Sequence, residues 1–228
     1  RAPGSDMETA KALRRNMLLD DNFPKDICEL ADYLWSSQDG AVVRAIPGYG
    51  TQVPIWILGS SLYGATLAAR LGLPYVFASH FAPAMLDKAI SIYRNTFKPS
   101  QWLATPYAMI GAGVFAADTD EEAVFLRSSQ LQAFANLILG HPRKLPAPVE
   151  DLSVVVSSHV QDQITRALSC SATGSPSSIK KQLQRLINRY EPDEVILSGM
   201  IHDHTARINS FRIAAEALMD LCDNQFAA

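Results

Sequence analysis

The amino-acid sequence predicts an α/β fold in which helices cover a parallel β-sheet. Four apolar runs without polar–apolar alternation are typical of buried parallel strands, and they lie at residues 53–58, 75–79, 107–117 and 194–199. Each run is followed by a segment whose apolar residues recur at helical spacing. Because parallel neighbours require such crossover connections, the alternating order indicates a sheet wound with helices.

The first fifty residues contain helices and loops. Asp6 is a capping residue for a helix over residues 7–17, and Pro24 occupies the first turn of a second helix over residues 24–35. Glycines on both sides of residues 42–46 leave room for one short strand there.

Residues 53–78 form the clearest unit of the chain. The first apolar run stops at Gly59-Ser60-Ser61, a helix of small residues covers Leu62–Leu71, and a second apolar run follows Pro74. This is a β-turn-α-β unit whose turn lies at a helix N-terminus. Unpaired N–H groups and the helix dipole favour an anion at that position. The unit therefore predicts a phosphate-bearing cofactor seated on the turn.

The remaining elements continue the alternation. Helices are expected over residues 83–97, 119–139, 162–168, 177–190 and 205–221. Residues 141–175 are predicted to be an irregular insertion apart from the short helix within them. We expect a single domain over residues 1–228.

Composition limits the function classes. The 228 residues are 48% hydrophobic and 19% charged, with a formal net charge of −3, which is typical of a globular protein and provides no basic footprint for nucleic acid. The longest apolar stretch is broken by glycines, a proline and Arg70, so no membrane association is expected. Cys28, Cys170 and Cys222 are far apart, which favours a cytoplasmic protein with buried, reduced thiols and no metal site.

The turn at residues 59–64 can hold a phosphate in a specific way. Gly59 lets the backbone approach closely, and the hydroxyls of Ser60 and Tyr63 can point at the anion. The same residues would serve equally well as the polar cap of an ordinary βα turn. Gly64 is followed by Ala-Thr without a lysine, so the segment is not a Walker A loop.

Two further features concern the carboxyl ends of the strands. His80 follows the second strand at the end that faces the site in βα folds, so it is a candidate catalytic or ligand-contacting residue. A structural role with a hydrogen-bonded ring is the alternative. Gly111-Ala112-Gly113 lies within a strand, where small residues indicate a crowded interior or a nearby ligand.

The histidines at 202 and 204 do not predict a metal site. Adjacent residues on a strand-to-helix turn point apart, and no other cluster supplies ligands. Capping by Asp203 and a pair between Asp203 and Arg207 are expected instead. The acidic run at residues 118–122 falls at a helix N-terminus, where carboxylates are stabilising.

Taken in order, several segments resemble the luciferase-like flavin monooxygenases, and within them a bacterial subgroup of uncharacterised oxidoreductases. These segments are RAPGSD at the start, VPIWILGSSLYG, LGLPYVFASHFAP, and DHTAR near the end. The likeness runs over essentially the whole chain. It implies a (β/α)8 TIM barrel, reduced FMN as cofactor, O2 and a small organic molecule as substrates, a separate flavin reductase as partner, and a homodimer.

The resemblance also implies site residues. The flavin phosphate would be held by the hydroxyls of Ser60 and Tyr63 and by the turn backbone at Gly59, Ser61 and Leu62. Arg1 matches an arginine that follows the fourth barrel strand in the family and would form a charge-assisted pair with the phosphate. His80 would lie at the rim of the pocket.

The chain is expected to supply strands five to eight of the barrel and their helices. The missing strands carry much of the ring and substrate pocket in the family, so the catalytic residues are expected outside this chain, and the isolated fragment is expected to be inactive. Two alternatives stay open: a deazaflavin-dependent hydride-transfer enzyme of the same fold, and a non-catalytic flavin-binding protein.

Overall fold

The computed structural model describes residues 7–12, 22–35 and 43–226, with the side chains of the last helix described to Leu221. Arg1 and the predicted continuation of the first helix to residue 17 lie outside the described residues. The chain divides into two compact units, Arg1–Ile55 and Trp56–Ala228, each of which is described by itself. The single-domain interpretation stays a prediction.

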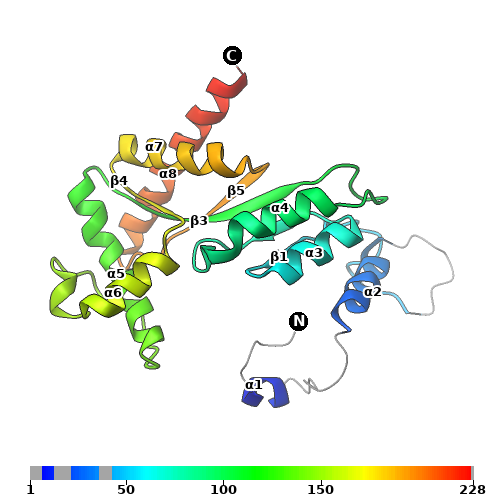
Figure 1. Ribbon diagram of the computed structural model, residues 1–228, viewed down its shortest axis with the longest axis horizontal. Helices are drawn as coiled ribbons and strands as arrows, with labels where there is room; N and C mark the ends of the chain where they lie inside the picture. The colour runs from blue at the N-terminus through cyan, green and yellow to red at the C-terminus, as the bar shows by residue number, and fades with distance from the viewer. Residues whose placement is uncertain (1–6, 13–21, 36–42, 227–228) are drawn as a thin grey trace. The chain divides into compact units, whose positions relative to one another are not determined.

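Within its described residues, the first unit contains two helices, α1 (Met7–Ala12) and α2 (Phe23–Trp35) (Figure 1). Helix α2 buries Ile27 and Ala31 on one face, as its apolar spacing predicts. After the helix, the indole Nε1 of Trp35 donates to the Val53 carbonyl at 2.9 Å. The expected strand at residues 42–46 is wrong over the described part, because residues 43–45 are irregular and a turn begins at Ile46. Cys28 is exposed, which corrects the prediction of buried thiols.

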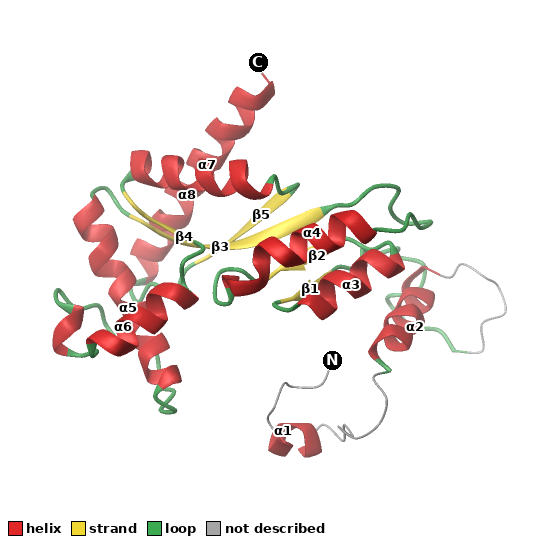
Figure 2. Ribbon diagram, in the orientation of Figure 1, coloured by secondary structure: helices red, strands yellow, loops and turns green. Residues whose placement is uncertain are grey.

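The second unit is built on five parallel strands surrounded by helices (Figure 2). The strands are β1 (Ile57–Gly59), β2 (Tyr75–Phe77), β3 (Ala108–Ala116), β4 (Ser171–Gly174) and β5 (Glu194–Ser198). The helices are α3 (Leu62–Leu71), α4 (Leu86–Thr96), α5 (Asp120–Ile138), α6 (Ser158–Ala167), α7 (Pro176–Tyr190) and α8 (His204–Phe226). Short 3₁₀ turns cover Pro83–Met85 and Leu152–Val154. Every strand pair is parallel, which confirms the α/β prediction.

Strand β3 is the centre of this sheet. Its first residues pair with β2, its last four pair with β4, and residues 109–113 pair with β5. Backbone groups of successive residues in a strand point to opposite edges. The Tyr107 carbonyl bonds toward β2 and the Gly113 N–H toward β4, whereas the Ala108 carbonyl bonds toward β5. Strands β2 and β4 therefore share one edge of β3, and β5 occupies the other.

A serine covers the gap between β2 and β4. The Gly111 carbonyl lies at this gap and accepts a hydrogen bond from the Ser79 hydroxyl at 2.6 Å. The Cys170 thiol approaches the same oxygen at 3.6 Å. The buried Ser79 side chain thus satisfies a carbonyl that no strand reaches, which fixes the residues just after β2.

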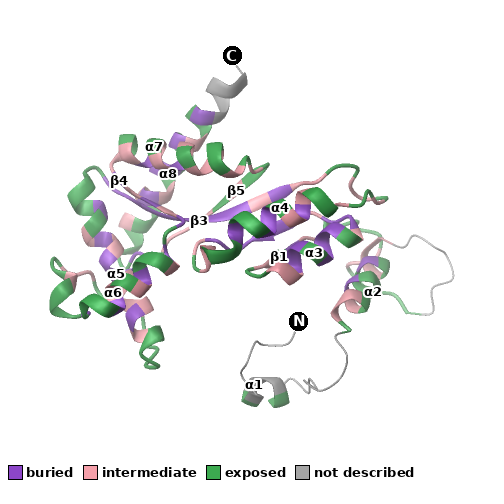
Figure 3. Cartoon of the chain, in the orientation of Figure 1, coloured by how far each residue is buried: buried purple, intermediate pink, exposed green. Residues whose placement is uncertain are grey.

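Helices cover both faces of the carboxyl half of β3, which is among the most buried parts of the chain in Figure 3. Phe115 and Ala117 pack on Ala123 and Leu126 of α5. The residues that alternate with them, including Val114 and Ala116, pack on α7 and α8. Because the chain steps from β3 to β4 in one direction and from β4 to β5 in the other, right-handed crossovers place α5 and α7 on opposite faces.

Two segment predictions differ from the structure. The expected irregular insertion at 141–175 contains a 3₁₀ turn, helix α6 and strand β4, so the irregular part is mainly the proline-rich stretch before Leu152. Strand β4 is four residues long, with alternating burial, and is stabilised by β3 pairing that the local sequence does not show. The first strand begins at Ile57 rather than at residue 53, partly because Pro54 has no N–H to donate.

Among the described helices, none has the length and apolarity needed to cross a bilayer.

Candidate functional site

The turn between β1 and α3 is an open helix N-terminus. Ser61 is the N-cap residue, with φ −136° and ψ 169°, but its side chain makes no capping hydrogen bond. Ser60 and Ser61 are exposed, and the first turn of α3 contains no acidic residue. The two serines at this end of the helix are therefore exposed, and the first turn of α3 supplies no carboxylate to its own N–H groups.

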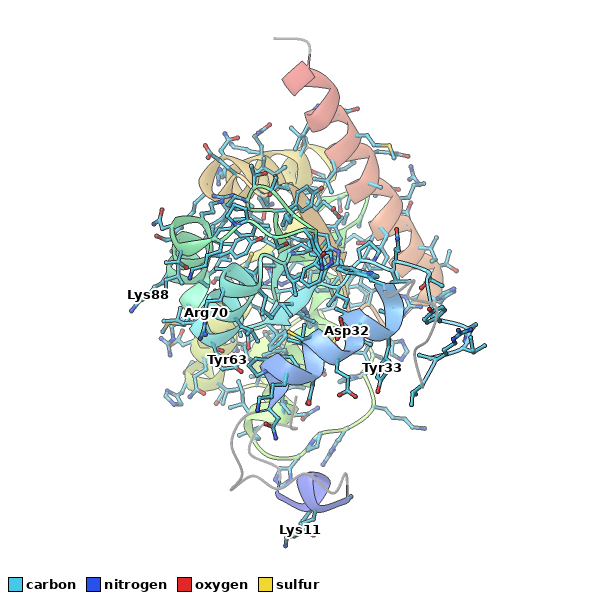
Figure 4. All side chains as sticks on the ribbon, turned by 90° about the vertical axis from the view of Figure 1, so that its right-hand side faces the viewer. Lys11, Asp32, Tyr33, Tyr63, Arg70 and Lys88 are labelled. Atoms are coloured by element: carbon cyan, nitrogen blue, oxygen red, sulfur yellow. The ribbon has the colours of Figure 1, made fainter. Side chains whose placement is uncertain are left out.

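Close packing fixes the turn on the sheet. A Cβ on Gly64 would lie 3.6 Å from the Gly59 Cα and 3.4 Å from the Tyr75 ring, so the helix sits directly against the strands. The Tyr75 hydroxyl donates to the Ser61 carbonyl at 3.4 Å, and burial raises the pKa of this phenol. Tyr63 is half-buried on the first turn of α3, and its hydroxyl oxygen is buried. Figure 4 labels Tyr63 together with Arg70, which belongs to the same helix.

The N-termini of α5 and α7 are arranged differently. Thr119 accepts a hydrogen bond from the Glu122 N–H at 3.2 Å and caps α5. Asp120, at the start of α5, accepts from the Ser175 N–H at 2.6 Å and from the Ser178 hydroxyl at 3.2 Å. These bonds, the backbone one first, lower the pKa of Asp120. The anion position in front of α7 is thus occupied by a carboxylate of the chain itself.

Helix α8 is capped by Asp203, which accepts from the Ala206 N–H at 2.7 Å, as predicted. The expected pair between Asp203 and Arg207 is wrong, because the Arg207 guanidinium instead lies 2.8 Å from the His204 Nδ1. Within the described residues, no three His, Cys, Asp or Glu side chains come together as a metal site.

His80 lies just beyond β2, against a glycine of β3. Its ring packs edge-on to Phe81 with 5.0 Å between centroids. A Cβ built on Gly111 would lie 2.5 Å from Nδ1, so only a glycine leaves room for the imidazole. Nδ1 is buried without a hydrogen-bond partner, and burial lowers the pKa of His80. The imidazole is therefore neutral at neutral pH.

The sheet face beside His80 is apolar and partly open. Gly111 pairs with Ile196 of β5, and paired residues in a sheet lie on the same face. The Ile196 side chain is 51% exposed, and Leu58 of β1 is 67% exposed. Leu58 points away from α3, because the neighbouring Ile57 is the residue that packs on Gly64. His80 is thus a polar group at the margin of an accessible apolar surface.

The structure gathers Gly59, Ser60, Ser61, Leu62 and Tyr63 in one turn at the carboxyl rim of the sheet. It places His80 at the same rim, after the adjacent strand. The role of Gly111 in seating the His80 ring was not predicted. The glycine-rich sequence within a strand was its signal, but the identity of its neighbour was not in the sequence.

Comparison with known proteins identifies the family of this chain. The sequence model of one family, described as luciferase-like monooxygenase, matches residues 32–190. This chain belongs to the luciferase-like monooxygenase family. Family members similar to it include a luciferase-like monooxygenase of Escherichia coli K12, which is 45% identical over 97% of this chain and 66% of its own length. Another is the uncharacterised protein YvbT of Bacillus subtilis, 43% identical over 95% of this chain and 65% of its own.

Solved structures show the same fold. The crystal structure of apo-MsnO8 covers 96% of this chain and 66% of its own, with a TM-score of 0.76 and 25% identity. An F420-dependent secondary alcohol dehydrogenase matches with a TM-score of 0.52 and 13% identity, which shows the fold alone. The chain thus spans about two thirds of the length of these relatives, and it forms a partial TIM-barrel-like α/β domain. The assignment to barrel strands five to eight stays a prediction.

Proposed function

We propose that the full-length protein is a flavin-dependent monooxygenase that holds the phosphate of reduced FMN on the turn between β1 and α3. The observation that carries this proposal is that the N-terminus of α3 directly follows β1 at the carboxyl rim of the sheet, with exposed serines, no side-chain cap and no acidic residue in the first turn. A helix end of this kind binds phosphate well, because its N–H groups and dipole act together on the anion.

Each residue of the turn has a distinct task in this proposal. The Ser60 hydroxyl would donate to the phosphate, as would the N–H groups of Ser61 and Leu62. The Tyr63 hydroxyl is buried in this structure, so its assignment to the phosphate rests on the family resemblance alone. Gly59, at the end of β1, lets the phosphate approach the backbone. Arg1, which lies outside the described residues, would add a charge-assisted bond. When bound, the reduced flavin supplies the electrons and the reaction with O2, while the protein binds, orients and excludes water.

The wider assignment follows from family membership. We infer a small organic substrate, a separate reductase that supplies reduced flavin, a homodimer, and a cytoplasmic location. Catalytic residues are assigned outside this chain, so the isolated fragment is expected to be inactive.

Substitution of Ser60 tests the phosphate turn. Ser60→Ala in the full-length protein should weaken FMN binding about fivefold, since one hydrogen bond contributes about 1 kcal/mol and tenfold corresponds to about 1.4 kcal/mol. Fluorescence titration measures the affinity, and riboflavin, which lacks the phosphate, should bind as before. Ser157→Ala is the matched control, because Ser157 is another exposed N-cap serine without a capping bond. Equal FMN affinity of Ser60→Ala and the parent protein would contradict the assignment.

The turn recognises an anion rather than a ring system, so a deazaflavin with a phosphate is a second candidate cofactor. Such an enzyme would transfer hydride without consuming O2. Oxygen uptake with reduced FMN separates the two reactions. Flavin binding without any turnover, in the presence of a reductase and a panel of substrates, would instead favour a non-catalytic binding protein.

A further inference from the structure

We propose that His80 is a ligand-contacting residue whose Nε2–H donates a hydrogen bond to an acceptor atom of the flavin nucleotide beyond its phosphate. Gly111 is the notch that seats the ring in this orientation. The contact geometry stands on the structure itself. Only the identity of the ligand rests on the function proposed above.

The first support is an unfavourable feature of the fold. Nδ1 of His80 is buried with no hydrogen-bond partner, although the ring packs well against Phe81 and Gly111. A buried polar atom without a partner reduces stability, and native proteins contain few of them. A phenylalanine would fill the same space without that cost. The imidazole therefore has a use other than packing.

The second support is the direction of the ring. In the described part of the chain neither ring nitrogen of His80 has a hydrogen-bond partner, and only Nδ1 is buried, so Nε2 is the accessible one. The hydrogen that replaces a side chain at Gly111 points at Nδ1, since a Cβ there would lie 2.5 Å from it. An unprotonated Nδ1 can accept a weak hydrogen bond from that Cα–H, whereas a proton on Nδ1 would collide with it. The ring proton therefore lies on Nε2.

The third support is the rigidity of the segment. Ser79, which precedes His80, is fully buried and bonds the Gly111 carbonyl at 2.6 Å. Burial alone lowers the pKa of His80, with no charged neighbour contributing, so the ring is a neutral donor at neutral pH. A fixed neutral donor can meet a carbonyl or hydroxyl oxygen without the desolvation cost of a charge.

The position of His80 suits a flavin held at the phosphate turn. Gly59 pairs with Phe77, so the phosphate turn and His80 follow adjacent strands at one rim of the sheet. Adjacent strands lie about 4.8 Å apart. The exposed side chains of Leu58 and Ile196 provide an apolar surface on the same side of the sheet as His80, where an aromatic ring system can lie. His80 Nε2 would donate to an acceptor on that ring or its sugar chain.

The test compares two ligands and three substitutions in the full-length protein. His80→Phe keeps a ring over Gly111 and removes both nitrogens, so it should weaken FMN and riboflavin equally, about fivefold. Its Tm should be unchanged or raised by about 1–3 °C, because the buried Nδ1 is gone. Gly111→Ala should displace the ring, weakening both ligands and lowering the Tm. Ser60→Ala should weaken FMN only.

The outcomes separate the two proposals. Unchanged affinity of His80→Phe for both ligands would overturn the role of His80, whatever Ser60→Ala does. A fall in Tm for His80→Phe comparable to that of Gly111→Ala would also overturn it, because it would show a structural role. Weaker binding of both ligands to His80→Phe, with no effect of Ser60→Ala, would support His80 and refute the phosphate turn.

Discussion

The helix end at α3 and the junction of α5 with α7 solve the same physical problem in opposite ways. Both present N–H groups and hydroxyls at the carboxyl rim of the sheet. At the junction, Asp120 fills the anion position with bonds to Ser175 and Ser178. At α3, the Ser61 side chain makes no capping bond and the first turn holds no acidic residue.

The difference shows where the chain gives up stability. A capped helix end contributes about 1 kcal/mol, and α3 forgoes that contribution. The junction is closed by the protein and is structural. In the function proposed above, the open turn is left to an external anion, and this difference separates the two turns although both are rich in serine.

The largest effect is expected from Gly174→Ala, which breaks the closed junction. Gly174 has φ +138°, and a Cβ there would meet Asp120 and the Ser178 Cβ, the latter at 2.7 Å. Strain and collision together should lower the free energy of unfolding by about 2–4 kcal/mol, measured by urea denaturation. Gly59→Ala is the matched control at the open turn. Its Cβ would meet only the Gly64 Cα at 3.6 Å, so a change of about 1 kcal/mol or less is expected.

A comparably large loss in Gly59→Ala would show that the open turn is as constrained as the junction. The comparison between the two turns would then fail.

The next largest effect converts the open turn into a closed one. Ser61→Asp should cap α3 and raise the free energy of unfolding by about 0.5–1 kcal/mol. The same carboxylate should repel the phosphate and weaken FMN binding at least tenfold, about 1.4 kcal/mol, without weakening riboflavin. Ser61→Asn is the control, because it caps without charge. Higher stability together with weaker FMN binding in Ser61→Asp, but not in Ser61→Asn, would support the difference between the two turns. Unimpaired FMN binding to Ser61→Asp would contradict it.

The smallest effect concerns the acid dependence of the junction. The hydrogen bond from the Ser175 backbone, followed by those from side chains, lowers the pKa of Asp120 in the folded state. Its contribution to stability is therefore present above about pH 4 and is lost as the pH falls through the lowered pKa. Asp120→Asn should reduce the difference between the urea midpoints at pH 7 and pH 3. Glu150→Gln, which removes an exposed carboxyl outside the helices, should leave that difference nearly unchanged.

Local patterns predicted the elements whose signals lie within a few residues. The apolar runs, the helix expected over residues 177–190 and the acidic start of α5 all appear in the structure. Strand β4 was missed because its four residues are short and mixed in polarity, and its stability comes from pairing with β3. Pairing of this kind joins segments more than fifty residues apart, which no local window contains.

The site shows the same limit. The open turn was predicted because its glycine, serines and helix start are contiguous in the sequence. The difference between this turn and the junction was not predicted. It depends on hydrogen bonds from Ser175 and Ser178 to Asp120, which lies 55 and 58 positions earlier in the chain. The seat of His80 on Gly111 is likewise a contact between two strands rather than a pattern in either.

The shared edge of β3 has a consequence for how this family can change. The Ala117 N–H donates to the Gly174 carbonyl at 3.3 Å. This hydrogen bond joins the two ends of the segment between Ala117 and Gly174, which therefore forms a closed loop. Lengthening a closed loop costs little conformational entropy, because the entropy cost of loop closure grows only with the logarithm of the loop length. Insertions or deletions near residues 140–151 can therefore change the length of this segment without moving β2, β5 or the turn before α3. Length variation among relatives should accumulate there.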